Sequence, residues 1–332
     1  MSVASARISR RQALLLAAGL ACGVATLAGC GSYGSVDEAK SQNAKAPTVS
    51  GSALLADGVL RIGVNADAAP YAWVADESTG ALGGFDVRVA LSMADEMGLR
   101  AQFVNVGTNV SAAAQRLCDV VMGVTSNDSA LADGQTTLVG SYSDAATAVF
   151  GRNVSGTVTL DQMTAGRVGV QTDSTSETVL AGVAPLYQPV KYASISAAFD
   201  ALSAGEVDYV VCDSFIGGYI ALGDDSIDFA GALELATSRG VGVAASNATL
   251  QSAVQGAIDA MQGDGTLETI RRSFVGDLPT VTPNNQIVAV ASAAGTPAAG
   301  AAPETVAPAE GEADEVTEAT LEGDVAEGDA AV

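Results

Sequence analysis

The side chains that could do chemistry in this chain include carboxylates, hydroxyls and thiols but no imidazole, because its 332 residues contain no histidine. Ser-His-Asp and Cys-His catalytic sites and the common His-containing zinc sites therefore cannot be built from it. The 38 Asp and Glu residues outnumber the 15 Lys and Arg residues, and the formal charge of −23 repels nucleic-acid phosphates. We expect no nucleic-acid partner, no metal, no cofactor and no catalytic residue, which makes binding the first functional hypothesis.

Asp213 is the carboxylate with the most informative position, because it ends an apolar strand and precedes the sequence Ser-Phe-Ile-Gly at 214–217. In α/β sheets, ligands bind beyond the carboxyl ends of the strands, where loops and helix N-termini present backbone donors. An aspartate at such a place can bind a ligand ammonium group, or it can cap the following helix, and the two roles are compatible. Asp213 is therefore a candidate binding residue.

Cys30 indicates covalent lipidation. Three arginines precede an apolar run at 13–27, which ends in the sequence Leu-Ala-Gly-Cys at 27–30. This pattern is typical of a lipoprotein signal peptide, and the run is shorter than the roughly 20 residues of a spanning helix. We expect a protein that is exported by the Sec or the twin-arginine route and is anchored outside the cytoplasmic membrane by lipid on Cys30.

Composition divides the chain into four segments. We expect a signal peptide at 1–29, a flexible tether at 30–57, a folded unit at 58–280 and a disordered acidic tail at 281–332. The tether is rich in Gly, Ser and Ala, which is typical of flexible linkers. The tail has no Lys or Arg and consists mainly of Ala, Pro, Glu and Gly, so it cannot bury a core.

Short β-branched runs alternate with Ala-rich amphipathic segments in the folded unit, which predicts βαβ units and mostly parallel strands. Asp86 is expected to cap the first helix. Cys118 and Cys212 adjoin predicted strands, and we expect two buried thiols. Strands are predicted at 60–64, 101–106, 119–123, 167–171, 187–192, 207–212 and 240–244, and helices at 87–97, 109–117, 174–181, 194–203, 247–261 and 265–274.

Seven short motifs, in this order, resemble those of the bacterial extracellular solute-binding proteins of family 3, the polar amino-acid receptors of ABC importers. The motifs are LRIGV at 60–64 with APY at 69–71, GGFDV at 83–87, DVVMGVT at 119–125, VGVQ at 168–171, ALSAGEVDYVVCD at 201–213, GDGT at 263–266 and FVG at 274–276.

The resemblance implies a two-lobed α/β fold of the type II periplasmic-binding-protein class, with two hinge strands and a ligand cleft between the lobes. The first lobe would comprise 58–146 and 235–280, and the second 147–234. It also implies a non-enzymatic receptor that captures a small polar solute, an amino acid or an amine, and delivers it to the membrane permease of an ABC importer. We expect it to act as a monomer.

The resemblance also implies which residues contact the ligand. Asp213 matches the aspartate that binds the ligand ammonium group, whereas Tyr71 also fits a core role, and Ser174 also fits a helix cap with Glu177. The candidate ligand-binding residues are Asn65, Tyr71, Gly123, Thr125, Gln171, Ser174, Thr175 and Asp213.

Three departures from the family pattern affect the expected ligand. Ala130 stands where the family has an arginine that binds the ligand carboxylate, and Ala68 stands where it has an aromatic residue. Asp173 replaces a usual glycine and either points to solvent or adds negative charge to the cleft. A negative cleft would favour amines over amino acids. Two other functions stay open: a ligand-degenerate sensor or interaction lipoprotein on the same fold, and a dehydratase-like enzyme that uses cleft carboxylates.

Overall fold

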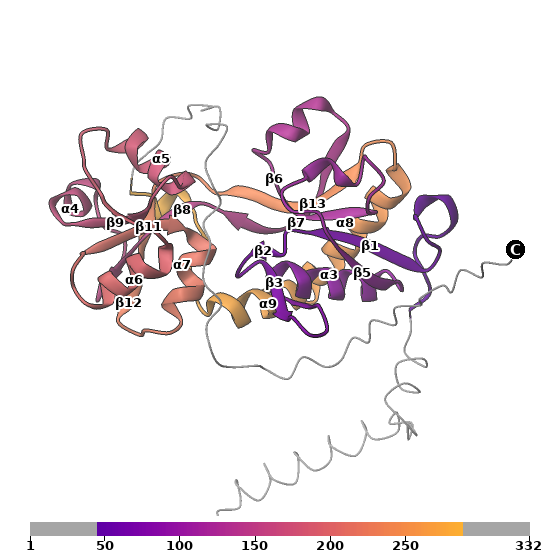
Figure 1. Ribbon diagram of the computed structural model, residues 1–332, viewed down its shortest axis with the longest axis horizontal. Coiled ribbons are helices and arrows are strands. Elements are labelled where there is room, and N and C mark those ends of the chain that lie inside the picture. The colour runs from indigo at the N-terminus through magenta and orange to yellow at the C-terminus, as the bar shows by residue number, and fades with distance from the viewer. Residues whose placement is uncertain (1–44, 288–332) are drawn as a thin grey trace, which may run out of the picture. The chain divides into compact units, whose positions relative to one another are not determined.

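The computed structural model describes residues 45–287; the predicted signal peptide, Cys30 and most of the acidic tail lie outside the described residues. Two five-stranded sheets form the framework (Figure 1). The first has the order β5 (Arg100–Asn105), β1 (Val59–Val64), β6 (Val120–Thr125), β13 (Thr237–Ala244) and β7 (Thr136–Ala145). The second has the order β10 (Val190–Tyr192), β9 (Val168–Gln171), β11 (Tyr209–Asp213), β8 (Thr147–Arg152) and β12 (Ile227–Ala232).

Helices accompany both sheets. We call lobe 1 the first sheet with α3 (Phe85–Glu96), α8 (Ala248–Gly263) and α9 (Thr266–Val275). We call lobe 2 the second sheet with α4 (Leu160–Ala165), α5 (Thr175–Val183), α6 (Ile195–Ser203) and α7 (Ser214–Ala221). A small antiparallel sheet of β2 (Asp67–Ala68), β3 (Ala72–Asp76) and β4 (Ala81–Gly83) lies between β1 and α3 in the sequence.

Strand directions follow the predicted βαβ pattern in part. β1 pairs in parallel with β5 and β6, and β9 pairs in parallel with β10 and β11, because a helix or a long crossover connects them. β13 runs antiparallel to β6 and β7, and β8 runs antiparallel to β11 and β12. The predicted two-lobed α/β fold is confirmed.

The chain crosses between the two sheets at neighbouring places. It passes from β7 to β8 through Ala146 and returns from β12 to β13 through residues 233–236. The crossings are joined by Glu234, whose Oε1 accepts hydrogen bonds from the Thr147 amide at 2.9 Å and from the Thr147 hydroxyl at 2.6 Å. The two connections therefore brace each other.

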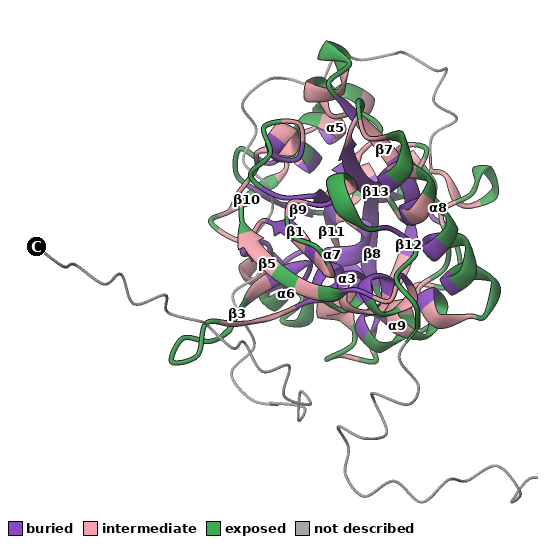
Figure 2. Cartoon of the chain, turned by 90° about the vertical axis from the view of Figure 1, so that its right-hand side faces the viewer, coloured by how far each residue is buried: buried purple, intermediate pink, exposed green. Residues whose placement is uncertain are grey.

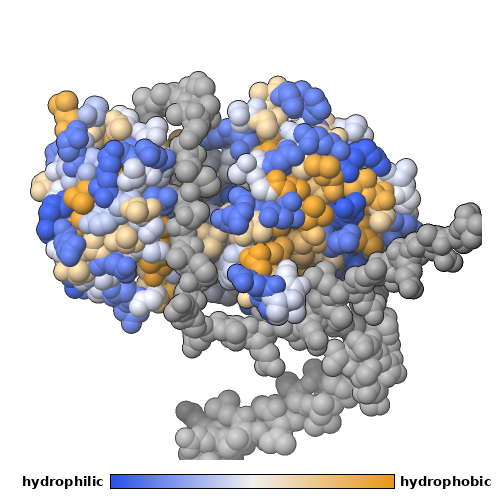
Figure 3. Space-filling view, viewed as in Figure 1, coloured by the Kyte–Doolittle hydropathy of each residue, from blue (hydrophilic) through white to orange (hydrophobic). Residues whose placement is uncertain are grey.

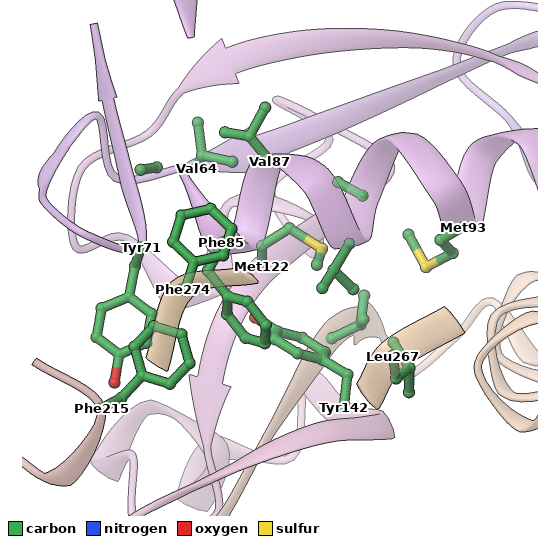
Figure 4. Packing of buried hydrophobic residues seen from close by; sticks show 14 of the residues in the cluster. Val64, Tyr71, Phe85, Val87, Met93, Met122, Tyr142, Phe215, Leu267 and Phe274 are labelled. Atoms are coloured by element: carbon green, nitrogen blue, oxygen red, sulfur yellow. The ribbon is translucent and has the colours of Figure 1, made fainter. Parts of the chain in front are cut away.

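An aromatic cluster packs where the lobes meet. The Phe215 ring of lobe 2 lies 4.5 Å from the Phe85 ring and 5.0 Å from the Tyr71 ring, measured between centroids, and Phe274 lies 5.8 Å from Phe85 (Figure 4). The buried residues line the sheets and the inner faces of the helices, while the helix surfaces that face away from the sheets are exposed (Figure 2). One hydrophobic cluster thus extends through both lobes.

The predicted helix at 109–117 is wrong. The structure has only a 3₁₀ turn, η3 (Val110–Ala112), followed by turns. Arg116 has a φ of 60°, a left-handed conformation that a helix cannot contain. The small residues Ala112 and Ala113 are buried against the sheet, so the backbone lies close to it and must turn sharply before β6.

The expected tether is structured from about residue 48 onward, so the expectation of flexibility up to residue 57 is wrong for this part. Val49 and Leu54 are buried in the core of lobe 1. The Thr48 amide donates to the Met97 carbonyl at 3.0 Å, and the Leu55 amide donates to Asp119 Oδ1 at 2.7 Å. Two buried apolar side chains and these hydrogen bonds hold a segment whose composition otherwise resembles a linker.

Residues 278–287, which we call the C-terminal segment, return to lobe 2 after α9. Leu278 packs beside Gly218 of α7, and Gln286 forms a parallel bridge with Ala232 at the end of the edge strand β12. The Ile287 amide donates to the Ala232 carbonyl at 2.8 Å. The segment also walls a hollow of about 460 Å³ beside α9. The first residues of the expected tail are therefore part of the fold.

None of the helices within residues 45–287 has the length and apolar character needed to cross a bilayer. Both lobes show hydrophobic side chains interspersed with hydrophilic ones in the view of Figure 3. Cys118 and Cys212 are both buried thiols, as predicted.

Candidate functional site

Asp213 lies at the carboxyl end of β11 and caps α7. Its Oδ1 accepts hydrogen bonds from the amides of Phe215 and Ile216, both at 2.9 Å, because aspartate is among the residues most favoured at a helix N-cap. Burial raises the pKa of Asp213 above its usual value, and these hydrogen bonds oppose that rise. Gln171 ends the adjacent parallel strand β9, so both side chains belong to the same edge of the lobe 2 sheet.

Tyr71 brings lobe 1 into contact with this carboxylate. Its hydroxyl donates to Asp213 Oδ1 at 3.0 Å, and its ring stacks on that of Phe215. Burial, followed by the nearby charge of Asp213, raises the pKa of Tyr71 well above its usual value, so the hydroxyl stays protonated and acts as a donor. Tyr71 is a buried core residue that also contacts Asp213, and its role in ligand binding stays a prediction.

An ion pair that was not expected from the sequence lies next to the Tyr71 ring. Arg239, on β13, places its Cζ 3.8 Å from the centre of the Tyr71 ring. Its Nη2 donates to Asp86 Oδ2 at 2.8 Å, and only 14% of the Arg239 side chain and 6% of the Asp86 side chain are exposed. Burial works to lower the pKa of Arg239, but Asp86, Tyr142 and Tyr71 outweigh it and the pKa is raised well above its usual value. Arg239 therefore stays protonated.

The prediction that Asp86 caps a helix is wrong. Gly84 occupies the N-cap position of α3, and Asp86 lies within the first turn with its carboxylate directed to Arg239 and Tyr142. The Tyr142 hydroxyl donates to Asp86 Oδ1 at 2.8 Å and accepts a hydrogen bond of 2.8 Å from the Gly123 amide. A buried carboxylate needs hydrogen-bond partners, and Asp86 has one on each oxygen, Tyr142 on Oδ1 and Arg239 on Oδ2.

Position 123 requires glycine, because a side chain there would collide with the ion pair. Its φ is 80°, and a Cβ built on it would lie 2.5 Å from Arg239 Nη2 and 2.9 Å from Asp86 Oδ2. Only glycine lets the ion pair lie against the backbone of β6. Gly123, Tyr71 and Asp213 are thus three predicted residues that the structure links through Asp86, Tyr142 and Arg239.

Two other lobe 1 candidates have their polar groups engaged locally. The amide and hydroxyl of Thr125 donate to Asp128 Oδ2 at 2.6 Å and 3.2 Å. The Asn65 Oδ1 accepts from the Asp67 amide at 3.2 Å. Thr125 is opposite Arg239 in the sheet register, whereas Asn65 directly follows β1.

The lobe 2 candidates form a group at the turn between β9 and α5. Ser174 caps α5, with its hydroxyl accepting from the Glu177 amide at 3.1 Å, and Thr175 is exposed. Gln171 is only 7% exposed, and its buried Oε1 has no hydrogen-bond partner within the described residues. A buried acceptor without a partner is unusual in a folded protein. Asp173 is exposed, as the solvent-facing alternative predicted.

A positive charge lies beside Tyr71, although the family's arginine is missing at position 130. Ala130 lies in η4 (Ser129–Asp133), and no arginine is found at that place, but Arg239 reaches the site from the returning hinge strand. The sequence offered one signal: Arg239 is the only charged residue of the strand Thr237–Ala244. Its role follows from the antiparallel register of β13 and β6, which the sequence does not reveal.

The arrangement combines oxygen acceptors with a cation. Asp213 and Gln171 carry the acceptors, and Arg239 carries the guanidinium. Asp86 and Asp213 are not adjacent, because Arg239 and the Tyr71 ring lie between them. Among the described residues, no three Cys, Asp or Glu side chains are grouped so that they could hold a metal ion.

The chain is similar to known proteins over most of its described part. The model of a family described as bacterial extracellular solute-binding proteins, family 3, matches residues 60–277. No relative was found among curated proteins.

Three solved structures share the fold, each with a TM-score of 0.58. The first is an ancestral cationic amino acid solute-binding protein, 22% identical, over 66% of this chain and 96% of its own. The second is a substrate-binding protein of a polar amino acid ABC uptake transporter from Streptococcus thermophilus, 17% identical, over 67% and 88%. The third is the L-cystine solute receptor of Neisseria gonorrhoeae, 17% identical, over 68% and 95%.

Proposed function

Because the chain belongs to family 3 of the bacterial extracellular solute-binding proteins, we propose that it captures a small polar solute with a protonated amine and delivers it to the permease of an ABC importer. The amine would bind Asp213, in the place where the Tyr71 hydroxyl now donates. The solute would be an amino acid or an amine. This proposal extends the family's binding role to a particular site and ligand group.

The proposal rests on one observation: residues of both lobes meet at the Asp213 carboxylate. Asp213 lies at the carboxyl edge of the lobe 2 sheet, and its contact with Tyr71 comes from lobe 1. A solute that replaces this hydrogen bond by a charge-assisted one would stabilise the contact between the lobes. Lobe closure around a ligand is a common way for two-lobed proteins to report that they are loaded.

The membrane part of the proposal rests on the sequence. Lipid on Cys30 would hold the receptor at the outer face of the membrane, close to a permease. Cys30→Ala should abolish labelling with a radioactive or alkyne-tagged fatty acid. Unchanged labelling of the variant would contradict the lipid anchor, while leaving the solute site untouched.

One observation favours the alternative of a sensor or interaction lipoprotein without a transported ligand. The centre of the site is filled by the chain's own side chains, since Tyr71 stacks on Phe215 and Arg239 lies over Tyr71. A solute must displace part of this arrangement. The alternative predicts that no small solute binds with useful affinity.

Thermal shift and calorimetry separate the two functions. The panel would contain the twenty L-amino acids, putrescine, cadaverine, spermidine and short peptides. A ligand at about 100 times its Kd adds about 2.7 kcal/mol to the free energy of unfolding. We expect at least one compound to raise Tm and Asp213→Asn to weaken its binding at least tenfold, because a charge-assisted hydrogen bond becomes neutral.

Asp264→Asn is the matched control, because Asp264 also accepts the amide of the residue two positions on, at 2.9 Å, yet is exposed at the start of α9. It should bind like the wild type. A panel without a single stabilising compound would favour the alternative function, and equal binding by Asp213→Asn would remove Asp213 from the site.

A further inference from the structure

The C-terminal segment, residues 278–287, forms a third connection between the lobes. The first two are the hinge crossings at Ala146 and at residues 233–236. The third leaves lobe 1 at the end of α9 and reaches Ala232, in the edge strand β12 of lobe 2, through Ile287. Hinge motion turns one lobe about the connections between them. A movement of the lobes must therefore bend this segment or detach one of its ends.

The first end of the segment lies where α9 of lobe 1 meets α7 of lobe 2. Arg271, on α9, donates from Nη1 to the Leu278 carbonyl at 3.0 Å. The Leu278 side chain packs against α7, because a Cβ built on Gly218 would lie 2.8 Å from Leu278 Cδ2. The rings of Tyr219 on α7 and Phe274 on α9 have their centroids 6.4 Å apart. This end is therefore held by both lobes.

The second end is held by lobe 2. Gln286 forms a parallel bridge with Ala232, and the Ile287 amide donates to the Ala232 carbonyl at 2.8 Å. The Ile287 side chain packs against the hydrophobic core of lobe 2, and a Cβ built on Gly231 would lie 2.7 Å from its Cγ1. Ala232 is the last residue of β12 before the second hinge crossing. The segment is thus attached to lobe 2 at the start of the hinge.

The middle of the segment is mostly exposed. Residues 279–284 are exposed apart from the half-buried Val281. The Thr282 amide donates to Asn285 Oδ1 at 2.8 Å, and Asn285 Nδ2 donates to the Thr280 carbonyl at 3.0 Å, so these bonds lie within the segment. Residues 279–281 border the hollow of about 460 Å³, which residues of both hinge crossings also line. The segment therefore passes the hinge with open space beside it.

The attachment to β12 can be released without unfolding a lobe. Exposed segments that are attached through few contacts open at a lower free energy than the core of a protein. Gln286 and Ile287 are both half-buried, and Gln286 Nε2 is buried without a partner within the described residues. A buried donor without an acceptor disfavours the docked state.

We propose that the C-terminal segment is a strap that restrains separation of the lobes, and that its release from β12 lets the lobes move apart. The docked strap favours the arrangement in which the Tyr71 hydroxyl of lobe 1 donates to Asp213 of lobe 2. Release of the strap should also speed the entry and exit of a solute between the lobes. This last consequence rests on the proposed function, whereas the restraint on the lobes does not.

The test measures the distance between the lobes in the absence of any solute. Spin labels are attached to Asp95→Cys on α3 and Asp200→Cys on α6, two exposed positions of lobe 1 and lobe 2. The native cysteines at 22 and 30 are replaced by serine, and those at 118 and 212 are buried. Double electron–electron resonance then gives the distribution of distances between the two labels.

Two truncations of the labelled chain are compared with the full-length protein. A chain that stops after Asp277 lacks the strap, so its distance distribution should shift to longer distances and become broader. A chain that stops after Ile287 keeps the strap and is the matched control. Its distribution should equal that of the full-length protein.

Two variants of full length separate release of the strap from a general loss of stability. Leu278→Ala/Ile287→Ser weakens both ends and should give the same shift to a smaller extent. Val254→Ala creates a cavity at the buried face of α8 and lowers the Tm without touching the strap. It should leave the distances as in the wild type. Circular dichroism at the temperature of the measurement checks that each protein is folded.

Two outcomes would overturn the proposal. The first is an unchanged distance distribution in both the chain that stops after Asp277 and the double variant. The second is an equal shift in Val254→Ala, because separation of the lobes would then follow from lower stability. The expected shift in a protein that binds no small solute would instead reject the proposed function and support the strap.

Discussion

The Tyr71 hydroxyl donates a 3.0 Å hydrogen bond to Asp213, and this bond joins a residue of lobe 1 to the helix cap of lobe 2. The ring of the same tyrosine carries Arg239 on its face. Tyr71 thus connects the negative and the positive group of the site, and any solute that binds Asp213 must compete with its hydroxyl.

Tyr71→Phe tests this competition. The variant keeps the ring stack on Phe215 and loses only the hydroxyl, so the free energy of unfolding should fall by about 0.5–1.5 kcal/mol. Binding of the solute's amine should become up to several-fold tighter, because no hydroxyl has to be displaced. Urea unfolding and calorimetry give the two values, and a binding loss of tenfold or more would show that the hydroxyl contacts the solute directly.

Asp213→Asn should reveal the cost of the buried carboxylate. The pKa of Asp213 is raised in the folded state, so between the unfolded pKa of about 3.9 and the folded value the native state holds more protons than the unfolded state. The contribution of this group to stability therefore decreases as the pH rises through that window. Asparagine caps a helix as well as aspartate does, and it has no charge to desolvate.

We accordingly expect Asp213→Asn to gain stability relative to the wild type between pH 3.5 and pH 7, measured as the difference in urea unfolding between the two proteins. The other carboxylates titrate in both proteins, so their contribution cancels in the difference between the wild type and the variant. A variant that loses stability relative to the wild type on going to pH 7 would contradict the raised pKa.

The pair of Asp86 and Arg239 should behave as one unit. Arg239→Gln alone leaves Asp86 buried without its counter-charge and should lower the free energy of unfolding by about 3–5 kcal/mol. The double variant Asp86→Asn/Arg239→Gln should lose much less, since it buries no unpaired charge. A double-mutant cycle from urea unfolding measures the coupling, and additive losses would show that the two charges do not interact.

The C-terminal segment should contribute to stability although the tail beyond it should not. A chain that stops after Ile287 loses Ala-, Pro- and Glu-rich sequence and should keep its Tm within a degree or two. A chain that stops after Asp277 also loses the packing of Leu278 and the pairing of Gln286 and Ile287 with lobe 2, and should unfold several degrees lower. Equal Tm values for the two truncations would show that the segment does not hold to lobe 2.

Much of the fold could be predicted because apolar runs set the strands. The run at 60–64 and the run that ends at Asp213 each form a buried strand of a sheet, and the spacing of apolar residues placed helices such as α6 and α8 correctly. The ordered part of the expected tether, from about residue 48 to residue 57, was not predicted. Its buried apolar residues are few, Val49 and Leu54 among them, and they lie within a Gly- and Ser-rich stretch.

The sequence pointed to Asp213, Tyr71 and Gly123, but not to the ion pair beside them. Asp213 follows an apolar strand and precedes a helix, which is a local signal. The pairing of Asp86 with Arg239 depends on the register of β13 and on the missing side chain of Gly123, both of which are properties of the assembled sheet. An aspartate at a helix start looks the same in sequence whether it caps the helix or neutralises a distant arginine.

The most direct test of the account is the crystal structure of the protein with its best-binding amino acid. We expect the solute's nitrogen within hydrogen-bond distance of the Asp213 carboxylate, with the Tyr71 hydroxyl displaced from Oδ1. A solute bound elsewhere, for example in the hollow beside α9, with the bond between Tyr71 and Asp213 intact, would contradict it.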